Sequence, residues 1–536
     1  MSELEWWQTA VIYQIYPRSF QDSTSDGIGD LPGITRRLDY LVDLGIDAIW
    51  ISPFYPSPMA DFGYDVADYT DVDPIFGTLT DFDELLATAH HLGLKVIIDI
   101  VPNHTSDQHR WFLESRSSRD NPKRDWYVWR DPMPDGSPPN NWLSAFGGGA
   151  WEWDETTGQF YLHTFVREQP DLNWRNPDVV EAMHDVYRFW LDRGVDGFRI
   201  DVAHRIMKDP DLRDNPPKPG ADGTFKSMGA YETQHHIHDM GHPDVHDAYR
   251  DLRAVLDSYD PPRVTIGEVH IFDWDEWVRY YGADLDGMHL PGNFTLLYVP
   301  WDAGAVRTRV DELEGILPDG AWPNYVLGNH DEPRLATRFG PERARLAAML
   351  LLTLRGTPTL YYGDELGMTE VTIAPEDQQD PWALREPELG RDGCRTPMQW
   401  DASGSAGFSD ADRASLWLPL TPDQATVNVK VLDQSPTSIL TLYRRLLALR
   451  RGMSALHQGT YSPIESAADG VFAFERAEGA QQVCVVLNFG DQAVRFVHEC
   501  VVGAEPLLST TLRRPNIDGA AVELAANEGL ILRLST

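Results

Sequence analysis

The sequence of 536 residues contains few cysteines and no long apolar run. Its three cysteines, Cys394, Cys484 and Cys500, are odd in number, and none are close enough in sequence to suggest a paired metal-binding motif. No uninterrupted apolar segment has the length of a membrane span, so we expect no membrane partner. A basic leader followed by an apolar core and a cleavage site is also missing at the N-terminus, which favours a cytoplasmic protein with reduced thiols.

Basic residues are scarce. There are 45 Lys and Arg residues against 83 Asp and Glu residues, a formal net charge of −38. Because the negatively charged phosphate backbone of a nucleic acid repels a protein with this much negative charge, the composition argues against a nucleic-acid partner.

Several catalytic motifs are absent. The sequence has no G-x-S-x-G nucleophile elbow, no G-x-G-x-x-G after a strand, no G-x-x-x-x-G-K and no H-E-x-x-H. Serine-hydrolase, dinucleotide, phosphate and zincin chemistries are therefore disfavoured.

Aromatic residues are plentiful, with 18 Trp and 20 Tyr, and many stand among polar residues. An aromatic ring offers one apolar face and a polar edge, which suits the C–H faces and hydroxyl edges of sugars. Ordinary core packing is the alternative for any single ring.

Short β-rich segments alternate with amphipathic helical segments that end in glycine. Such alternation predicts a parallel sheet, and eight units predict a (β/α)8 TIM barrel of the α/β class. The expected strands lie in residues 10–17, 47–53, 95–103, 196–202, 263–269, 285–293, 324–331 and 357–365, and helical patterns cover 33–45, 81–93, 178–194 and 342–356.

The barrel is expected to carry one inserted subdomain and one further domain. We assign residues 1–103 to its first part, 104–172 to a subdomain inserted after the third strand, and 173–455 to its second part. From residue 456 to 536 the pattern changes to short β-like pieces, which predicts a C-terminal all-β sandwich.

Polar residues gather at the carboxyl ends of four expected strands, where parallel barrels build their active sites. Arg199 and Asp201 share a short apolar segment, and a satisfied structural ion pair is one explanation for them. That explanation accounts for one strand and not for four. Cleavage of a glycosidic bond needs one ionised carboxylate and one protonated carboxylic acid, and carboxylates are the residues found here.

The motifs at these strand ends resemble glycoside hydrolase family 13, the α-amylase family, and in particular its oligo-1,6-glucosidase and α-glucosidase branch. The similarity covers essentially the whole chain. It is carried by DIVPNH at 99–104, QPDLNW at 169–174, GFRIDV at 197–202, GEV at 267–269 and GNHD at 328–331.

The resemblance implies three catalytic carboxylates. Asp201 would be the nucleophile, Glu268 the general acid and base, and Asp331 the carboxylate that holds sugar hydroxyls, in a double displacement that retains the α configuration. Arg199 lies two residues before Asp201, so the two side chains face the same side of the strand and Arg199 would keep Asp201 ionised. Glu268 must carry a proton, which an apolar setting or the neighbouring Asp331 would favour.

The resemblance also implies residues that bind the first sugar. His104 and His330 resemble the histidines that bond glucose hydroxyls, with a packed core histidine as the alternative, and Tyr64 resembles the stacking platform. Phe146 and Phe165 are expected to line the next subsite, although core packing is the alternative for each.

A pair of charged residues is expected to close the inner end of the pocket. Asp65 resembles the aspartate that binds distal hydroxyls, and Arg395 in GRDGCRTPMQW resembles the arginine that pairs with it. A closed pocket implies attack at the chain end with release of one glucose. No catalytic cofactor is expected, and the partners would be short oligosaccharides such as isomaltose, isomaltulose, maltose or sucrose-like sugars, bound by a monomer or weak homodimer.

The segment 22–30, DSTSDGIGD, resembles a calcium or magnesium loop of this branch. Its ligands would be Asp22, Thr24, Asp26, the Ile28 carbonyl and Asp30, and the ion would be structural. Relatives more often have Asn at the position of Thr24, and an Asx-turn loop without metal is the alternative. An EF-hand is excluded, because its Glu is missing at the twelfth position.

Val202, directly after the expected nucleophile, resembles the valine that accompanies α-1,6-linked substrates, where Thr or Ala accompanies α-1,4-linked ones. Val269 and His270 depart from the Met-Pro pair of strict oligo-1,6-glucosidases, which predicts a broader range. Two alternatives stay open. One is a glucosyltransferase or disaccharide isomerase, although LATRFG at 335–340 lacks the arginine-rich segment of sucrose isomerases; the other is a non-catalytic binding or transporter-partner homologue.

Overall fold

Eight parallel strands form the central sheet of the computed structural model, which describes residues 4–219, 228–384 and 389–535. The order is β10-β11-β1-β2-β3-β7-β8-β9, and a parallel bridge between Asn293 and Tyr325 joins its two ends into a barrel. All eight strands predicted from the sequence are present. They are β1 (Ile12–Ile15), β2 (Ala48–Ile51), β3 (Lys95–Ile100), β7 (Gly197–Ile200), β8 (Val264–Gly267), β9 (Leu290–Pro291), β10 (Asn324–Val326) and β11 (Thr357–Tyr361).

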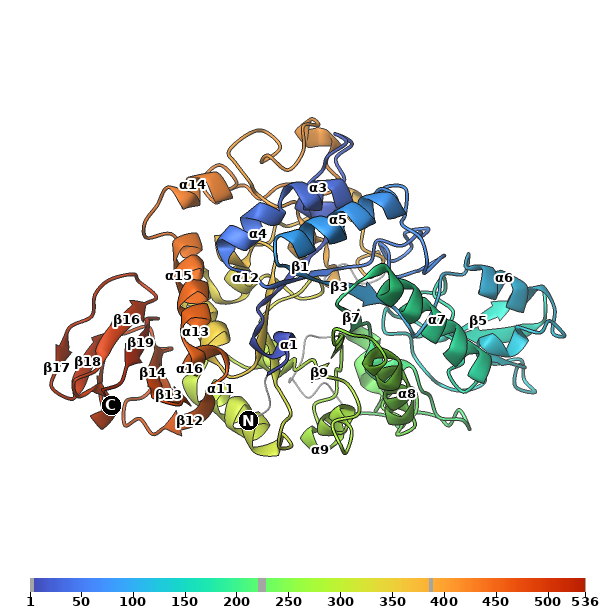
Figure 1. Ribbon diagram of the computed structural model, residues 1–536. Helices are drawn as coiled ribbons and strands as arrows, with labels where there is room; N and C mark the ends of the chain where they lie inside the picture. The colour runs from blue at the N-terminus through green and yellow to red at the C-terminus, as the bar shows by residue number, and fades with distance from the viewer. Residues whose placement is uncertain (1–3, 220–227, 385–388, 536) are drawn as a thin grey trace.

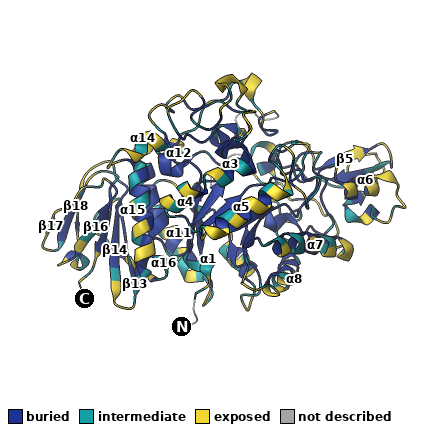
Figure 2. Ribbon diagram, turned by 45° about the horizontal axis from the view of Figure 1, so that its top comes forward, coloured by how far each residue is buried: buried dark blue, intermediate teal, exposed yellow. Residues whose placement is uncertain are grey.

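Helices surround the barrel, with exposed residues on their outer faces and buried residues toward the strands (Figures 1 and 2). Helix α7 shows how the sequence sets its ends: the Asn176 side chain accepts the Asp178 N–H at the start, and Gly194 ends the helix in the left-handed conformation. The longer helices are α5 (Leu79–His91), α6 (Arg110–Ser117), α7 (Pro177–Arg193), α8 (Val245–Asp257), α11 (Ala303–Ile316), α13 (Pro341–Thr353) and α15 (Ile439–Gly452). The shorter ones are α1 (Trp6–Thr9), α2 (Pro17–Phe20), α3 (Leu31–Arg36), α4 (Leu38–Leu44), α9 (Trp274–Trp277), α10 (Thr295–Tyr298), α12 (Leu335–Phe339), α14 (Val429–Asp433) and α16 (Ser454–His457).

One predicted helix is divided in two. The pattern over 33–45 predicts a single helix, but α3 ends at Arg36 and α4 begins at Leu38. Arg37 between them leaves the helical conformation, donates to the Gln21 side chain at 2.6 Å and stacks on the Trp400 ring at 4.1 Å. These tertiary contacts override the local helical preference.

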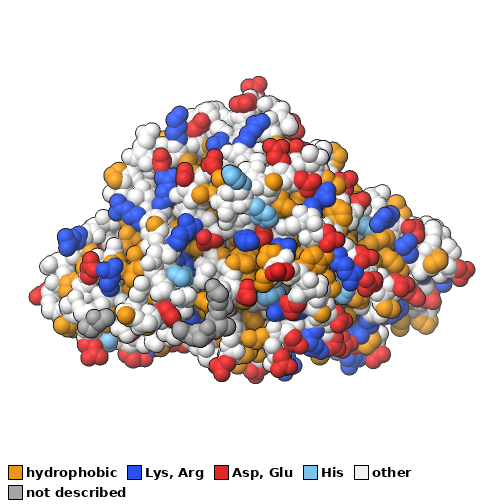
Figure 3. All heavy atoms as spheres, in the orientation of Figure 1, with side chains coloured by type: hydrophobic (Ala, Val, Ile, Leu, Met, Phe, Trp, Pro, Cys, Tyr) orange, Lys and Arg blue, Asp and Glu red, His pale blue; other side chains and the backbone are white. Residues whose placement is uncertain are grey.

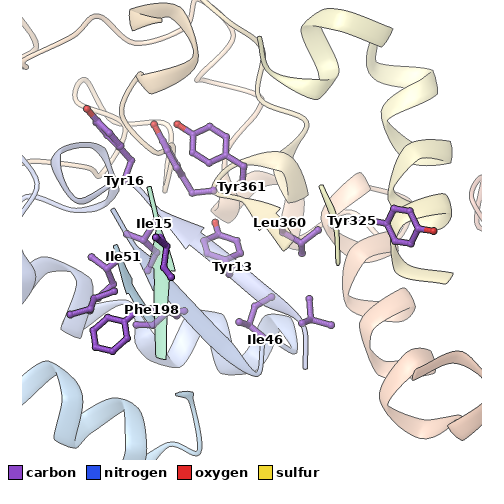
Figure 4. Close-up of a cluster of buried hydrophobic side chains, with 14 of the residues drawn as sticks. Tyr13, Ile15, Tyr16, Ile46, Ile51, Phe198, Tyr325, Leu360 and Tyr361 are labelled. Atoms are coloured by element: carbon purple, nitrogen blue, oxygen red, sulfur yellow. The ribbon is translucent and has the colours of Figure 1, made fainter. Parts of the chain in front are cut away.

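Successive side chains along each barrel strand point alternately outward, toward the helices, and inward. Outward side chains such as Tyr13, Ile15 and Phe198 pack toward the helices (Figure 4), and each fully buried apolar side chain contributes roughly 1.5–3 kcal/mol. Inward side chains at one end of the barrel are apolar, with Trp7 and Trp322 packed against them. Toward the carboxyl ends the inward positions become polar, and that change of composition places the site.

The inserted segment after β3 contains α6 and a three-stranded antiparallel sheet of order β4-β6-β5. Its strands are β4 (Trp129–Arg130), β5 (Trp151–Asp154) and β6 (Gln159–Leu162), and it extends from one side of the barrel in Figure 1. Aromatic residues fill it, including Phe112 stacked on Trp129 at 5.7 Å.

The C-terminal part is a β-sandwich on the opposite side of the barrel (Figure 1). A five-stranded sheet of order β12-β13-β14-β19-β16 faces a three-stranded sheet of order β15-β18-β17 across a small apolar core. The strands are β12 (Thr460–Ile464), β13 (Val471–Glu478), β14 (Gln481–Asn488), β15 (Val494–Val497), β16 (Glu505–Ser509), β17 (Ile517–Asp518), β18 (Ala521–Leu524) and β19 (Gly529–Arg533).

Two buried arginines join the sandwich to the barrel. Arg450 donates to the carbonyls of Leu352, Gly356 and Leu456, at 3.0, 2.6 and 2.9 Å. Arg476 from β13 donates to the Thr353 carbonyl at 2.5 Å and to two carbonyls next to β12. The carboxyl end of α13 is thus capped by guanidinium groups, which favours its dipole.

No helix in the described part of the chain is long and apolar enough to cross a membrane. Acidic side chains are spread over the face shown in Figure 3 and interspersed with Lys and Arg.

Candidate active site

The carboxyl ends of β3, β7 and β8 bring three carboxylates to one guanidinium. Arg199 Nη1 contacts Asp99 Oδ1 at 3.0 Å and Asp201 Oδ1 at 2.7 Å, and Nη2 contacts Glu268 Oε2 at 2.6 Å. Asp99 and Arg199 are direct partners in the β3–β7 register. All four side chains are almost completely buried, so the cluster is held by charge-assisted hydrogen bonds and not by solvent.

The sequence predicts that Arg199 keeps Asp201 ionised. In the structure Arg199 contacts both Asp201 and Glu268. Burial and the nearby charge of Glu268 raise the pKa of Asp201 well above its usual range. Burial also opposes ionisation of Glu268, but Arg199, His270 and the Val202 N–H outweigh it and hold the pKa of Glu268 well below its usual range. Arg199 is thus shared between the two carboxyls, and an ionised Asp201 beside a protonated Glu268 stays a prediction.

Val202 has a positive φ of 36°, an unfavourable backbone conformation for a β-branched residue. Its N–H donates to Glu268 Oε2 at 2.9 Å. This turn ends the alternation of the strand, so Val202 lines the same cavity as Asp201.

Two histidines and Tyr64 form one wall of the cavity. The rings of Tyr64 and His330 are stacked at 5.3 Å with an angle of 3°, and the Tyr64 hydroxyl lies 2.6 Å from His330 Nε2. His104 Nε2 contacts the Gln169 side chain at 3.0 Å. Burial lowers the pKa of His330 to about 3 and that of His104 to about 4, so both rings are neutral hydrogen-bonding groups at pH 7.

Arg391 lines the cavity and is the centre of a group of ion pairs. Its Nη2 contacts Asp61 Oδ1 at 2.7 Å and Asp380 Oδ1 at 2.7 Å, and its Nη1 contacts Asp331 Oδ1 at 3.0 Å. Arg395 reaches the same Asp331 oxygen at 3.0 Å. Burial opposes ionisation of Asp331, but His330, Arg391 and Arg395 lower its pKa well below the usual range.

The predicted pairing of Asp65 with Arg395 is wrong. Asp65 is fully buried and accepts hydrogen bonds from the Ser57 hydroxyl and the Ala60 and Asp61 N–H groups. Gly63, with φ of 106°, turns the chain so that Tyr64 lines the cavity while Asp65 lies within its own loop. Asp61 and Arg391 form the ion pair instead.

The cavity has a volume of about 310 Å³, and Phe146 and Phe165 both line it. Their rings meet edge to face at 5.3 Å, and Phe146 stacks on Trp382 at 5.0 Å. The cavity brings together most of the residues expected from the sequence, namely Tyr64, His104, Phe146, Phe165, Asp201, Val202, Glu268, His330 and Asp331.

The carboxylates of the loop 22–30 accept hydrogen bonds, most of them from N–H groups of the same loop. Asp22 Oδ1 accepts the Thr24 and Ser25 N–H groups, and Oδ2 accepts the Gly27 N–H and the Ser409 hydroxyl. Asp26 accepts the Ile28 N–H, and Asp30 accepts the N–H groups of Ser23 and Gly33. Residues 4–219, 228–384 and 389–535 contain no group of three His, Cys, Asp or Glu arranged for a metal. The loop therefore has the Asx turns of the alternative interpretation, and the predicted ion is not shown.

Sequence reasoning missed several residues of the cavity. Arg391 stands beside Arg395 in GRDGCRTPMQW, and Asp61 lies four residues before Asp65, but loops lack the periodicity that would separate inward from outward positions. Tyr298, His270 and Glu332 also line the cavity. His270 Nε2 lies 3.3 Å from Glu268 Oε1, and the Tyr298 hydroxyl donates to Glu332 at 3.0 Å.

Comparison with known families gives one match that spans most of the chain. The alpha amylase catalytic domain matches residues 14–459. The chain belongs to the alpha-amylase family. It is accordingly a glycoside hydrolase by family. Enzymes of this class use a pair of carboxyl groups, and such groups are clustered in this site.

Individual relatives of this alpha-amylase family member are similar over nearly their whole length. A probable alpha-glucosidase of Rhizobium meliloti (strain 1021) is 46% identical over 502 residues, covering 91% of this chain and 90% of the relative. An oligo-1,6-glucosidase of Parageobacillus thermoglucosidasius is 38% identical, covering 92% of each.

Two solved structures are similar as well. An alpha-glucosyl transfer enzyme, XgtA, is 43% identical with a TM-score of 0.94, covering 99% of this chain and all of that one. A mutant isomaltulose synthase of Erwinia rhapontici NX5, in complex with its natural substrate sucrose, is 34% identical with a TM-score of 0.89 and full coverage of both chains.

Proposed function

We propose that this protein is an exo-acting, retaining α-glucosidase that removes terminal glucose from short α-linked oligosaccharides. Asp201 is the nucleophile and Glu268 the general acid and base, while Asp331, His104 and His330 hold glucose hydroxyls. The names of the relatives support the substrate class.

One observation carries the proposal. Asp201, Glu268 and Asp331 come from the ends of three different strands and line a single cavity, together with the Asp61–Arg391 ion pair. We infer that this ion pair closes the inner end of the cavity. A binding protein needs hydroxyl partners but no buried cluster of like charges, which is costly to maintain. A closed end admits one sugar ring and excludes a continuing chain.

The spacing of the two carboxyls supports retention. One guanidinium contacts both Asp201 and Glu268, through its two neighbouring nitrogens. Retaining enzymes keep their carboxyls about 5 Å apart, whereas inverting enzymes need room for a water between them. Attack by Asp201 on the anomeric carbon forms a glucosyl ester as the leaving oxygen takes a proton from Glu268, and water then hydrolyses the ester.

The proton needed by Glu268 comes from the cluster as a whole. Asp99, Asp201 and Glu268 face one Arg199, so three buried carboxyls share one fixed positive charge. Burial raises the pKa of both Asp99 and Asp201. Protons in such a set belong to the group rather than to one residue. Substrate that displaces Glu268 from Arg199 and the Val202 N–H places this proton on Glu268, and Arg199 then stabilises an ionised Asp201.

Both α-1,6 and α-1,4 linkages are proposed as substrates, with isomaltose or isomaltulose cleaved at least as well as maltose. Val202 lines the cavity next to the nucleophile, so its bulk meets the second sugar. One methyl or hydroxyl group contributes roughly 1–3 kcal/mol of discrimination, which supports a preference and not an exclusion.

A glucosyltransferase or disaccharide isomerase is the second candidate, because the two similar solved structures bear such names. The glucosyl ester would be the same, with a sugar hydroxyl replacing water as acceptor. We therefore include some transglucosylation in the proposed activity.

The decisive experiment follows the products of maltose, isomaltose and sucrose by proton NMR. The proposal expects free glucose, with the α anomer formed first, and loss of the reaction in Asp201→Asn. A first-formed β anomer would refute retention, and products made only by transfer or isomerisation would favour the second candidate. The cytoplasmic location, the monomer or weak homodimer and the divalent ion at 22–30 stay predictions.

A further inference from the structure

Two cysteines that lie apart in the sequence meet in the C-terminal sandwich. Cys484 lies in the middle of β14 with its side chain fully buried, and Cys500 lies in a single 3-10 turn, η10 (Glu499–Val501), and is half-buried. Their Sγ atoms are 3.1 Å apart. The spacing of the cysteines gave no sign of this contact, because it depends on how the two sheets pack.

The surroundings divide the two thiols into an accessible one and a protected one. Cys484 lies in the apolar core of the sandwich with Phe496 and Leu532. Cys500 donates its N–H to His498 Nδ1 at 3.2 Å. The contact with Cys484 and the neighbouring His498 lower the pKa of the Cys500 thiol, while burial opposes this, as does Glu475, which lies opposite Cys484 in the β13–β14 register. Cys500 is therefore the thiol that an external reagent reaches as thiolate.

We propose that Cys484 and Cys500 form a reversible intramolecular disulfide by exchange with low-molecular-weight disulfides. The Cys500 thiolate attacks one sulfur of the reagent and releases a thiolate, which leaves a mixed disulfide. Cys484 then loses its proton to the released thiolate and attacks Cys500 Sγ, expelling the second half of the reagent. Two protein thiols are oxidised, one reagent disulfide is reduced, and two small thiols are the products.

The disulfide would link the segment that crosses between the two sheets of the sandwich to strand β14. η10 follows β15 of the three-stranded sheet and precedes β16 of the five-stranded sheet, while Cys484 belongs to the five-stranded sheet. A bond there restricts the unfolded chain and fixes the crossing in the folded one. Neither cysteine lines the substrate cavity, so we expect the oxidised protein to keep its glucosidase activity.

Cys394 provides an internal control. Its Sγ contacts the His330 and Arg391 carbonyls at 3.3 and 3.1 Å, and burial raises its pKa to about 12. With no cysteine partner and no exposed edge, it should stay reduced under the same treatment.

The test treats the full-length protein with oxidised glutathione or with dithiothreitol, then denatures it and alkylates the free thiols. Mass spectrometry should show a decrease from three alkylated cysteines to one, and a peptide that links Cys484 to Cys500. The midpoint of thermal unfolding should rise by a few degrees and return after reduction. Cys484→Ser should instead stop at a glutathione adduct on Cys500 and show no such rise.

Three results would overturn the proposal: three free thiols after oxidation, a lasting glutathione adduct on Cys500 of the wild type, or a crosslink that includes Cys394. Circular dichroism of Cys484→Ser and Cys484→Ala shows whether these variants are folded, so that misfolding can be separated from the loss of the second thiol. If both variants fail to fold, the thiol count and the linked peptide of the wild type decide alone.

Discussion

Replacing Asp61 by Asn tests the closed end of the cavity. Asp61 Oδ1 accepts Arg391 Nη2 at 2.7 Å, Oδ2 accepts the Gln169 side chain at 3.1 Å, and the residue is buried. Asn keeps the shape and removes the charge, so no void is created. A hydrogen bond to a charged group contributes about 1.5–3 kcal/mol, which predicts a fall in kcat/KM on maltose of about tenfold to a hundredfold.

The matched control is Asp65→Asn, four residues away. Asp65 is equally buried but accepts only from its own loop and does not line the cavity. We expect this variant to lower the midpoint of thermal unfolding while its kcat/KM on maltose stays close to wild type. A larger loss of kcat/KM in Asp65→Asn than in Asp61→Asn would refute the assignment.

A double-mutant cycle then separates the ion pair from its surroundings. Arg391→Gln leaves Asp61, Asp331 and Asp380 with one cation fewer, so alone it should lower kcat/KM more than Asp61→Asn does. The two changes together should cost less than their sum, because each removes the same contact. Strict additivity would show that Asp61 and Arg391 act independently.

Four other predictions concern the rest of the chain. Asp201→Asn and Glu268→Gln should each lower turnover by several orders of magnitude with an unchanged circular dichroism spectrum; near wild-type rates would remove the assignment. Val202→Thr should shift the ratio of kcat/KM for isomaltose and maltose toward maltose, and an indifferent ratio would count against the linkage argument. Chelation with EDTA should lower the midpoint of thermal unfolding, and added calcium should restore it, if the loop 22–30 holds the predicted ion; an unchanged midpoint would leave it an Asx-turn loop. Burial holds the pKa of His330 near 3, below its unfolded value of about 6.5, so the stability it contributes is present above pH 6.5 and is lost as the pH falls toward 3. Urea unfolding should show a loss of about 2 kcal/mol from this residue between pH 7 and pH 5, and a pH slope unaltered in His330→Gln would contradict it.

The barrel could be predicted from the sequence because its signals are local. Each strand is a short β-rich segment, and the helices carry amphipathic patterns that end in glycine, as Gly194 ends α7. The positions of the two carboxylates proposed as nucleophile and general acid could be predicted for the same reason, whereas their roles were implied by the family resemblance. Asp201 and Glu268 stand directly after strands, and parallel strands bring such positions to one rim.

The floor of the cavity could not be predicted in the same way. Asp61 and Arg391 come from loops 330 residues apart, and two candidates of each type stand within a few residues of one another. Residues with positive φ at Met59, Phe62 and Gly63 shape the loop that carries both aspartates, and such turns have no periodic signal in the sequence. The contacts of Glu268 could not be predicted either, because the side chain is bound by Arg199 and by the N–H of Val202, whose backbone is left-handed.

The capping of α13 by Arg450 and Arg476 determines whether the C-terminal sandwich can be deleted from the barrel. Both guanidinium groups are buried, and burial lowers their pKa values to about 10 and about 9. Deleting residues 456–536 would remove Arg476 together with the Leu456 carbonyl that Arg450 binds, leaving the Thr353 carbonyl exposed at a helix end. The sandwich is thus not a detachable accessory, and a truncated barrel should be recovered as insoluble protein. Fusion partners and circular permutations should be introduced elsewhere, at exposed loops of the inserted segment.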